Sequence, residues 1–429
     1  MSDKVAINVV SSSGKEYVVW GFKGQSIYEA LLLHNFDTEG SCAGRGACGK
    51  CKVKVEGLLS TISETEREMM LPEELKQNIR LACQAIIQGE VTVYLNNYET
   101  LNKASLYHGI ESNTEGEVKV QSFYIPGLDK ELSIPIHSRI KETLKDYEVK
   151  LTPENINQLL SIDRLGRPSL ELQAVIFNNK IVKYVSRENG SAYGIALDLG
   201  STSLFAALVD LISGEVLAVS SITNMQRIYG ADIISRISYS SQNDEGQRNL
   251  QQILINNVNS MIEELINETG ILSRQIYSFA VVGNPIMLHF FAGISVKGFS
   301  SFPYVGAFVD ELVLKAKDIG LLANWDADLI LLPQVGGFVG ADTVAALLNL
   351  DTVNSCYLMV DIGTNGEIVL HKNGRMWATS AAAGPAFEGG HITCGVRAGA
   401  GSIDKVFLND EKELEFHIIG DQPVRGLCG

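Results

Sequence analysis

The stretch SCAGRGACGKC at residues 41–51 places three cysteines on one glycine-rich segment, and a fourth follows after 31 intervening residues. The full pattern is Cys42-x5-Cys48-x2-Cys51-x31-Cys83. Thiolates that converge on one point suit a soft metal, and three close cysteines with a distant fourth are typical of a 2Fe–2S site. The glycines let the backbone wrap closely around such a cluster. We therefore predict that these four cysteines bind a 2Fe–2S cluster.

Zinc is the alternative for this site, because four thiolates also suit Zn2+. A structural zinc site usually pairs two C-x2-C motifs, and this sequence contains only one. The remaining cysteines, Cys356, Cys394 and Cys428, have no partner spacing, so we expect buried free thiols. The cysteine segment resembles the ferredoxins. Its five-residue first gap is closer to the adrenodoxin-like pattern than to the plant-type gap of four.

Composition narrows the class of protein. The chain has 429 residues, is 45% hydrophobic, and carries a net charge of −15. This length predicts several domains with sizeable cores, and the acidic charge argues against a nucleic-acid partner. No apolar run approaches the ~18 residues of a membrane span, so we expect no membrane partner. The seven cysteines form an odd number and no export signal precedes them, which predicts a cytoplasmic protein.

Hydrophobic periodicity predicts a multidomain chain. Strand-like alternation and a short helix, with a capping box from Ser26 to Glu29, predict an α+β first domain. Further on, a strand–turn–strand pattern and an apolar helical stripe over residues 250–266, ended by Gly270, predict an α/β domain. The expected segments are a 2Fe–2S ferredoxin domain at 1–96, a linker at 97–116, a middle domain at 117–191, and an α/β domain at 192–429.

Two similar hairpins occur in the last segment. The first is DLGSTS at 198–203 and the second is DIGTNGE at 361–367. Each places an aspartate at a strand end before a tight turn, whose N–H groups suit phosphate oxygens, while the carboxylate suits Mg2+ through water. The plain alternative is that both aspartates only cap turns. The sequence contains neither a Walker A loop nor a G-x-G-x-x-G turn after a strand.

This pair of hairpins resembles the superfamily of acetate and sugar kinases, heat-shock chaperones and actin, and so implies an actin-like (RNase H-like) ATPase fold. The resemblance implies that Asp198 and Asp361 organise Mg2+ and the attacking water. It also implies that the turn amides hold the phosphates of ATP. The implied phosphate-binding residues are Gly200, Ser201, Thr202, Ser203, Gly363, Thr364, Asn365 and Gly366.

The whole chain resembles the reductive activators of corrinoid-dependent proteins, which join a β-grasp 2Fe–2S ferredoxin domain to such an ATPase. Beside the cysteines and hairpins, the resemblance rests on VGNPIM at 282–287, VGGFVGADT at 335–343 and AGPAFEG at 383–389. It implies ATP-dependent one-electron reduction of Co(II) corrinoid to Co(I) on a corrinoid protein of methyl transfer. An upstream reductase or ferredoxin would supply the electron. Family members continue past this point, so we expect a chain truncated within its second ATPase lobe.

Two other functions remain open. The chain could be an ATP-coupled electron donor to a different low-potential enzyme, such as a dehydratase. It could instead be a non-catalytic module that senses ATP or redox state.

Overall fold

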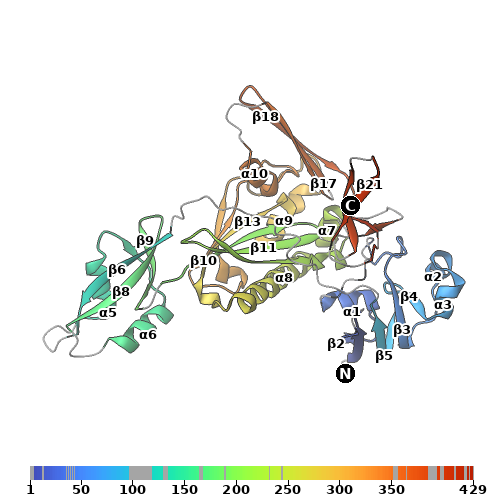
Figure 1. Cartoon of the computed structure of the whole chain (residues 1–429), viewed down its shortest axis with the longest axis horizontal. Coiled ribbons are helices and arrows are strands. Elements are labelled where there is room, and N and C mark those ends of the chain that lie inside the picture. Colours follow the sequence, from blue (N-terminus) through green and yellow to red (C-terminus); the bar gives the residue numbers. More distant parts are fainter. Residues whose placement is uncertain are drawn as a thin grey trace.

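The computed structural model describes residues 4–11, 14–34, 36, 38, 40, 42, 44–95, 118–128, 134–163, 168–187, 190–230, 232–242, 245–350, 356–363, 365–384, 394–396, 401–409, 412–419, 423–424 and 426–428, with only the backbone for Cys428. These residues form five β-sheets. The largest sheet lies between the N-terminal sheet and the sheet that follows it in the sequence (Figure 1). Among the described helices, none combines the length and hydropathy that a membrane span requires. The predicted linker, residues 97–116, lies outside the described residues.

The N-terminal sheet has the strand order β2-β1-β5-β3-β4. Strand β1 pairs antiparallel with β2 and parallel with β5, so the sheet is mixed. One helix, α1, packs into its core, as the capping box from Ser26 to Glu29 predicts for the start of that helix. The elements are β1 (Lys4–Val10), β2 (Glu16–Phe22), α1 (Ile27–Leu33), β3 (Lys52–Leu59), α2 (Glu64–Met69), α3 (Pro72–Lys76), β4 (Ile79–Leu81) and β5 (Ile87–Tyr94).

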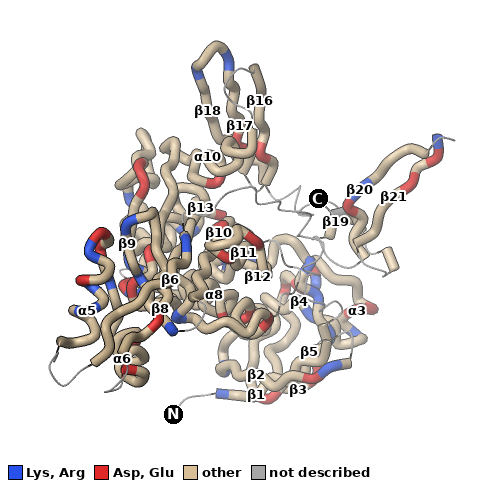
Figure 2. Tube along the Cα trace, turned by 60° about the vertical axis from the view of Figure 1, so that its left-hand side comes forward, with Lys and Arg blue, Asp and Glu red and all other residues tan. Residues whose placement is uncertain are grey.

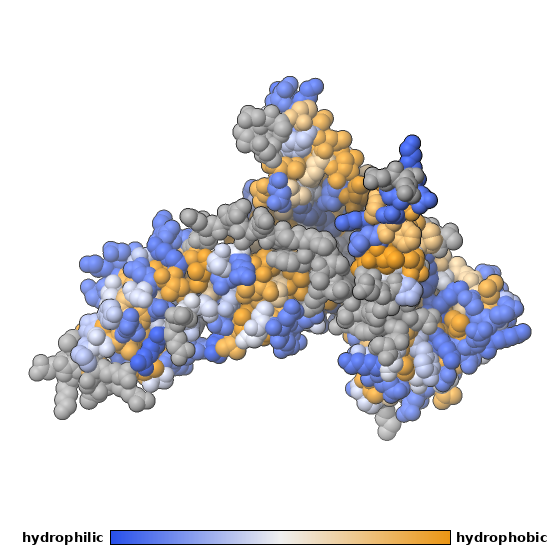
Figure 3. All heavy atoms as spheres, in the orientation of Figure 1, coloured by the Kyte–Doolittle hydropathy of each residue, from blue (hydrophilic) through white to orange (hydrophobic). Residues whose placement is uncertain are grey.

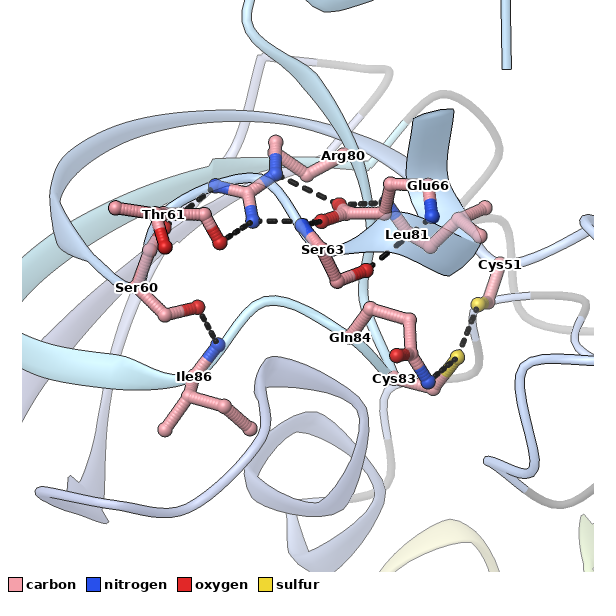
Figure 4. Close-up of polar contacts among 10 residues, drawn as sticks. All are labelled: Cys51, Ser60, Thr61, Ser63, Glu66, Arg80, Leu81, Cys83, Gln84 and Ile86. Carbon is pink, nitrogen blue, oxygen red and sulfur yellow. Dashed lines mark hydrogen bonds and ion pairs between the residues drawn. The ribbon is translucent and has the colours of Figure 1, made fainter. Parts of the chain in front are cut away.

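A buried ion pair fixes the strand that leads to Cys83. Arg80 on β4 donates to both carboxylate oxygens of Glu66, at 2.7 and 2.8 Å, and Glu66 is fully buried (Figure 4). The same carboxylate accepts from the backbone N–H groups of Ser63 and Leu81. Burial opposes ionisation, but these hydrogen bonds outweigh it and lower the pKa of Glu66. Helix α2 and strand β4 are therefore locked together two residues before the fourth cysteine.

The second sheet, of order β6-β8-β9-β7, carries two helices and forms a small mixed domain. It packs on the central sheet through a cluster that includes Val118, Phe177 and Tyr277. An ion pair from Lys183 to Asp328 crosses the same boundary. The elements are β6 (Val118–Pro126), α5 (Ile136–Thr143), β7 (Glu148–Val149), α6 (Pro153–Ile162), β8 (Ser169–Phe177) and β9 (Ile181–Ser186).

The central sheet has the order β12-β11-β10-β13-β15-β14, in which β10, β13 and β15 run parallel. Helix α8 packs along β12 and touches α7 and α9. Its apolar stripe is buried as predicted, and Gly270 ends the helix in the left-handed region at φ +74°. The elements are β10 (Tyr193–Leu199), β11 (Ser203–Asp210), β12 (Val216–Thr223), η1 (Met225–Ile228), α7 (Ile233–Gln242), α8 (Gly246–Thr269), η2 (Ser273–Gln275), β13 (Ile276–Gly283), α9 (Pro285–Ala292), η3 (Lys297–Phe299), β14 (Leu312–Lys315), η4 (Ala316–Ile319), β15 (Asp328–Leu331) and α10 (Ala341–Leu347).

The C-terminal residues form two further sheets, of orders β16-β17-β18 and β19-β22-β20-β21. One face of the first sheet exposes the apolar side chains of Leu358, Val360 and Trp377. Much of the surface over this sheet is orange in Figure 3. The elements are β16 (Tyr357–Ile362), β17 (Asn365–Lys372), β18 (Arg375–Ala382), β19 (Gly395–Val396), β20 (Ser402–Leu408), β21 (Leu414–Ile418) and β22 (Gly426–Cys428).

Our prediction of buried free thiols beyond the cysteine cluster is wrong at two positions. Cys356 and Cys394 are free but exposed. The reason is local: each lies directly before a strand of the C-terminal sheets, where little protein covers the chain. The side chain of Cys428 lies outside the described residues.

We expect Arg80→Met to destabilise the protein by about 3–5 kcal/mol, because it leaves the carboxylate of Glu66 buried without its charge partner. The measurement is urea unfolding followed by circular dichroism. Lys54→Met is the matched control, since Lys54 is exposed and its ammonium makes only weak contacts, at 3.9 Å to Glu56 and at 5.2 Å to the ring centre of Tyr94. It should change stability by less than about 0.5 kcal/mol. Equal losses in both variants would contradict this account.

Candidate functional site

Four cysteines come together at one end of the N-terminal domain. Three lie on the cluster loop, residues 40–51, of which Ser41 and Ala43 lie outside the described residues, and Cys83 follows β4. The loop needs glycine at position 46, where φ is +73° and a Cβ atom would lie 2.8 Å from the amide nitrogen of Gln84. The chain therefore turns tightly between the first and second cysteines.

The four thiols are arranged as two pairs. The sulfur of Cys51 donates to that of Cys83 at 3.4 Å (Figure 4), and Cys42 forms the same kind of bond with Cys48. Within the described residues, no group of three or more cysteine, histidine or acidic side chains surrounds a single point as one metal ion requires. Two pairs suit two iron atoms better than one tetrahedral zinc ion, so the donor set fits a 2Fe–2S cluster.

The paired thiols differ in acidity. The hydrogen bond from Cys51 lowers the pKa of Cys83 to about 7, against an opposing effect of burial. Donating that bond, and burial, raise the pKa of Cys51. The bond to Cys48 and burial raise the pKa of Cys42 in the same way. Each pair therefore holds one proton tightly, and that proton must leave when a metal ion takes its place.

One polar side chain that the sequence analysis did not single out contacts this site. The amide nitrogen of Gln84 donates to the sulfur of Cys83 at 3.7 Å (Figure 4). Hydrogen bonds to ligand sulfurs stabilise negative charge there and help set the reduction potential of iron–sulfur clusters. Adjacency to a predicted ligand was the only signal in the sequence for this role.

A second site lies at the carboxyl end of the central sheet. Strand β10 ends beside Asp198 and turns into β11 through Gly200 and Ser201, with Leu199 paired to Leu204. A Cβ atom at Gly200 would lie 2.3 Å from the carbonyl oxygen of Ser203, so only glycine fits this turn.

Three consecutive carbonyl groups of this turn are held from one side. Asn224 donates from its side chain to the Gly200 oxygen at 2.9 Å and from its backbone to the Thr202 oxygen at 2.8 Å. Arg236 donates to the Ser201 oxygen at 2.6 Å. Because C=O and N–H point in opposite directions in a trans peptide, the next three N–H groups point away from Asn224 and Arg236. The turn thus presents successive amide donors on one side, which suits an anion.

The second predicted hairpin contributes Asp361. It lies on β16 directly opposite Glu367 on β17, and Glu367 accepts from the hydroxyl of Ser380 at 2.9 Å. Gly363 donates to the carbonyl of Asn365 and closes the turn. The return strand β17 begins at Asn365, and its second residue, Gly366, lies opposite Ile362, whereas Thr364 lies outside the described residues.

A third aspartate joins the two predicted ones. Asp342 lies in the first turn of α10, whose start packs against the end of β13. A Cβ atom at Gly340 would lie 2.3 Å from the carbonyl oxygen of Gly283, so glycine permits this approach. The sequence analysis quoted the motif at 335–343 but assigned Asp342 no role. Acidic residues lie where β16 and β17 approach α10 in Figure 2.

The pKa values of these acidic residues are raised by burial and by one another's negative charge, and no basic side chain contributes to the shifts. Desolvation, and the charges of Asp342 and Asp361, raise the pKa of Asp198 to about 6, although its side chain is accessible to solvent. Desolvation and the charge of Asp361 also raise the pKa of Asp342. Desolvation, followed by the charges of Asp342 and Asp361, raises the pKa of Glu367. These carboxylates do not surround a single point as direct ligands of one ion would, so a divalent cation here would be held through its water molecules.

Comparison with known protein families divides the chain into three parts. Residues 11–88 match the 2Fe–2S iron–sulfur cluster binding domain, residues 193–354 match the RACo middle region, and residues 355–429 match the C-terminal domain of RACo, the ASKHA domain. The chain has the domains of the RACo family. The 2Fe–2S match supports a 2Fe–2S cluster in the N-terminal domain, and the ASKHA match supports ATP binding.

Individual proteins agree with the family match. The chain is 28% identical over 399 residues to the corrinoid activation enzyme RamQ of Eubacterium limosum, covering 90% of this chain and 63% of that protein. It is 28% identical over 225 residues to the [Co(II) methylated amine-specific corrinoid protein] reductase of Methanosarcina barkeri, covering 49% of this chain and 40% of that protein. The solved structure of a reductive activator for corrinoid, iron–sulfur protein is 27% identical, with a TM-score of 0.63, and covers 99% of this chain and 70% of that one.

We expect Gln84→Leu to lower the midpoint potential of the cluster, because the reduced state loses a hydrogen bond to one of its sulfur ligands. A redox titration, monitored by electron paramagnetic resonance, measures this shift in midpoint potential. Gln88→Leu replaces an exposed glutamine of β5 and should leave the potential unchanged. A wild-type potential in Gln84→Leu would contradict the role of this side chain.

We expect Asp198→Asn to raise the melting temperature at about pH 8 in the absence of divalent cations. A raised pKa means that the folded protein binds the proton more tightly, so the charged aspartate opposes folding once the pH exceeds about 6. The gain should shrink as the pH falls from about 6 toward 3.8, because the folded protein then keeps its proton, and it should also shrink on adding Mg2+ at pH 8. Asp310→Asn removes the same charge from an exposed loop and is the control. A gain independent of pH would exclude this cause.

Proposed function

We propose that the protein reduces the inactive Co(II) form of a corrinoid protein to Co(I), by one electron, in a reaction that ATP drives. The supporting observation is that one chain of the RACo family joins a paired-cysteine site to an acidic site with an anion-binding turn. The names of the two relatives described above refer to corrinoid activation and to a Co(II) corrinoid protein, which favours this acceptor over a dehydratase.

The cysteines would hold the cluster as two pairs. Cys42 and Cys48 would bind one iron, and Cys51 and Cys83 the other. The cluster supplies one electron at low potential when bound. The chain contributes the rest: Cys51 and Cys83 are buried, Cys48 is partly exposed, and the cluster loop leaves this one sulfur nearest to solvent and to a docking partner.

The acidic site would hold ATP with Mg2+. Asp198, Asp342 and Asp361 would hold the hydrated ion, and the first or last of these would orient the attacking water. The amides of the turn at 200–203, and those of the turn at 363–366, would hold the phosphates. Asn224 and Arg236 keep the first turn in a single orientation, so its donors need not reorganise when an anion arrives.

Nucleotide hydrolysis has an energetic use here. Each ~59 mV by which the cobalt acceptor lies below the donor costs about 1.4 kcal/mol for one electron. A nucleotide that binds one conformation better than another shifts the population toward it by its differential affinity. Coupled to the electron donor, ATP could offset a deficit of this size. The electron would reach the cluster from an upstream reductase or ferredoxin.

The test mixes the reduced protein with a corrinoid protein in its Co(II) state and follows the Co(I) absorbance with and without ATP. We expect Co(I) to form only with ATP, and Asp361→Asn to slow its formation by about 100-fold or more. Asp318→Asn, an exposed residue of η4, is the control and should behave as wild type.

Failure to form Co(I), or equal formation without ATP, would overturn the proposal. A cheaper measurement separates the metals: a colourless protein loaded with zinc would exclude electron transfer, whether to a corrinoid protein or to a dehydratase. Nucleotide binding without electron transfer from an intact cluster would instead favour a sensing module.

A further inference from the structure

A short 3-10 helix, η1, lies between the two candidate sites. Its residues Met225, Gln226 and Arg227, and its N-cap Asn224, are all buried, although three of the four side chains are polar. Buried polar side chains cost free energy unless they are hydrogen-bonded, so their contacts are specific features of the fold. The central α/β domain thus buries a polar segment where it meets the N-terminal domain.

One end of this segment holds the anion-binding turn. Asn224 contacts the turn twice, at the carbonyl oxygens of Gly200 and Thr202. The same side chain caps η1 by accepting from the backbone of Gln226 at 3.0 Å. Gln226 in turn accepts from Arg236 at 3.2 Å, and Arg236 donates to the remaining turn carbonyl. The turn and η1 are therefore joined by a closed set of hydrogen bonds.

The other end of the segment holds the cluster loop. Arg227 donates to the carbonyl oxygen of Gly40, two residues before the first cysteine ligand. Its guanidinium also lies over the ring of Tyr28, 5.9 Å from the ring centre. A Cβ atom at Gly40 would lie 3.3 Å from Tyr28 and 3.1 Å from the Cβ of Cys51, so this loop segment is packed tightly beside the third cysteine.

Apolar contacts make the junction rigid. Met225 belongs to the hydrophobic core of the N-terminal domain, and Ile228 and Ile253 pack against that core. The backbone of Met225 is held by Asn257 of α8 at 3.0 Å. Because η1 contacts both domains, a displacement of η1 at the turn would also displace Arg227.

We propose that Arg227 is a positioning residue that couples nucleotide binding at the turn to the redox state of the cluster. The inference rests on the proposed function, because it requires both a cluster and a bound nucleotide. Phosphate at the turn amides polarises the carbonyls that Asn224 and Arg236 hold, and these residues shift η1. Arg227 then changes its contact with the cluster loop and so changes the positive charge near the cluster.

Linkage makes this coupling measurable from either side. If nucleotide changes the reduction potential, the redox state must change nucleotide affinity by the same free energy. A tenfold difference in affinity between the oxidised and reduced protein corresponds to 59 mV in a one-electron potential. We expect the oxidised protein to bind more tightly, because nucleotide at the turn would draw the positive charge of Arg227 away from the cluster, where that charge stabilises the added electron.

The experiment measures the affinity of a non-hydrolysable ATP analogue for oxidised and for dithionite-reduced protein by anaerobic calorimetry. We expect a ratio of about fivefold or more in the wild type. In Arg227→Met the ratio should fall toward one while the visible circular dichroism of the cluster is retained. Arg227→Lys, which keeps the charge and one donor, should retain part of the ratio.

A second variant covers the case in which Arg227→Met fails to load its cluster. Asn224→Ser preserves the cap acceptor for η1 but removes the donor to Gly200, and it should also reduce the ratio. Arg274→Met is the matched control: this arginine makes an exposed ion pair with Glu154 at 3.5 Å, and its loss should leave the ratio unchanged.

The outcomes separate this inference from the proposed function. A wild-type ratio of one, or an unchanged ratio in Arg227→Met and Asn224→Ser with intact clusters, overturns the coupling role and leaves the proposed activity standing. A wild-type protein that binds no cluster or no nucleotide overturns both.

Discussion

Burial of several carboxylates at the end of the central sheet is the constraint on which the second candidate site depends. Asp198, Asp342 and Asp361 come from three separate segments. Desolvation raises the pKa of Asp198 and of Asp342, and the charge of Asp361 raises both further. The fold brings them together only because glycine allows close backbone contacts, as where Gly340 meets the end of β13. In the proposed function, a hydrated divalent cation would offset the cost of ionising these carboxylates.

Patterns with short range in the sequence predicted the fold well. The capping box at Ser26, the buried stripe of α8 and its Gly270 cap, and the two aspartate hairpins all depend on neighbours within a few turns or one strand pair. The cysteine spacing predicted a cluster domain, which the family match supports. Such features are encoded locally, and a single sequence is enough to detect them.

Features that arise between distant segments were not predicted. Asp342 is 144 residues from Asp198, and Arg227 meets a glycine carbonyl 187 residues away. Nothing in the residues around either position signals these contacts. Burial of a lone cysteine likewise depends on what lies over it, and so the expectation for Cys356 and Cys394 was wrong. Tertiary contacts determine which distant residues meet and which cysteines are buried, and such contacts produce no periodic pattern in the sequence.

The position of Met225 bears on how the N-terminal domain can be handled. Its side chain completes the core of a domain to which it does not belong in sequence, together with Ile228 and Ile253. A fragment cut after residue 95 would therefore lose part of its own interior and present an uncovered apolar patch to water. The N-terminal domain is thus not structurally independent of the central domain. Side chains of the central α/β domain complete its interior, so a substitution on either side of this boundary affects the packing of both domains.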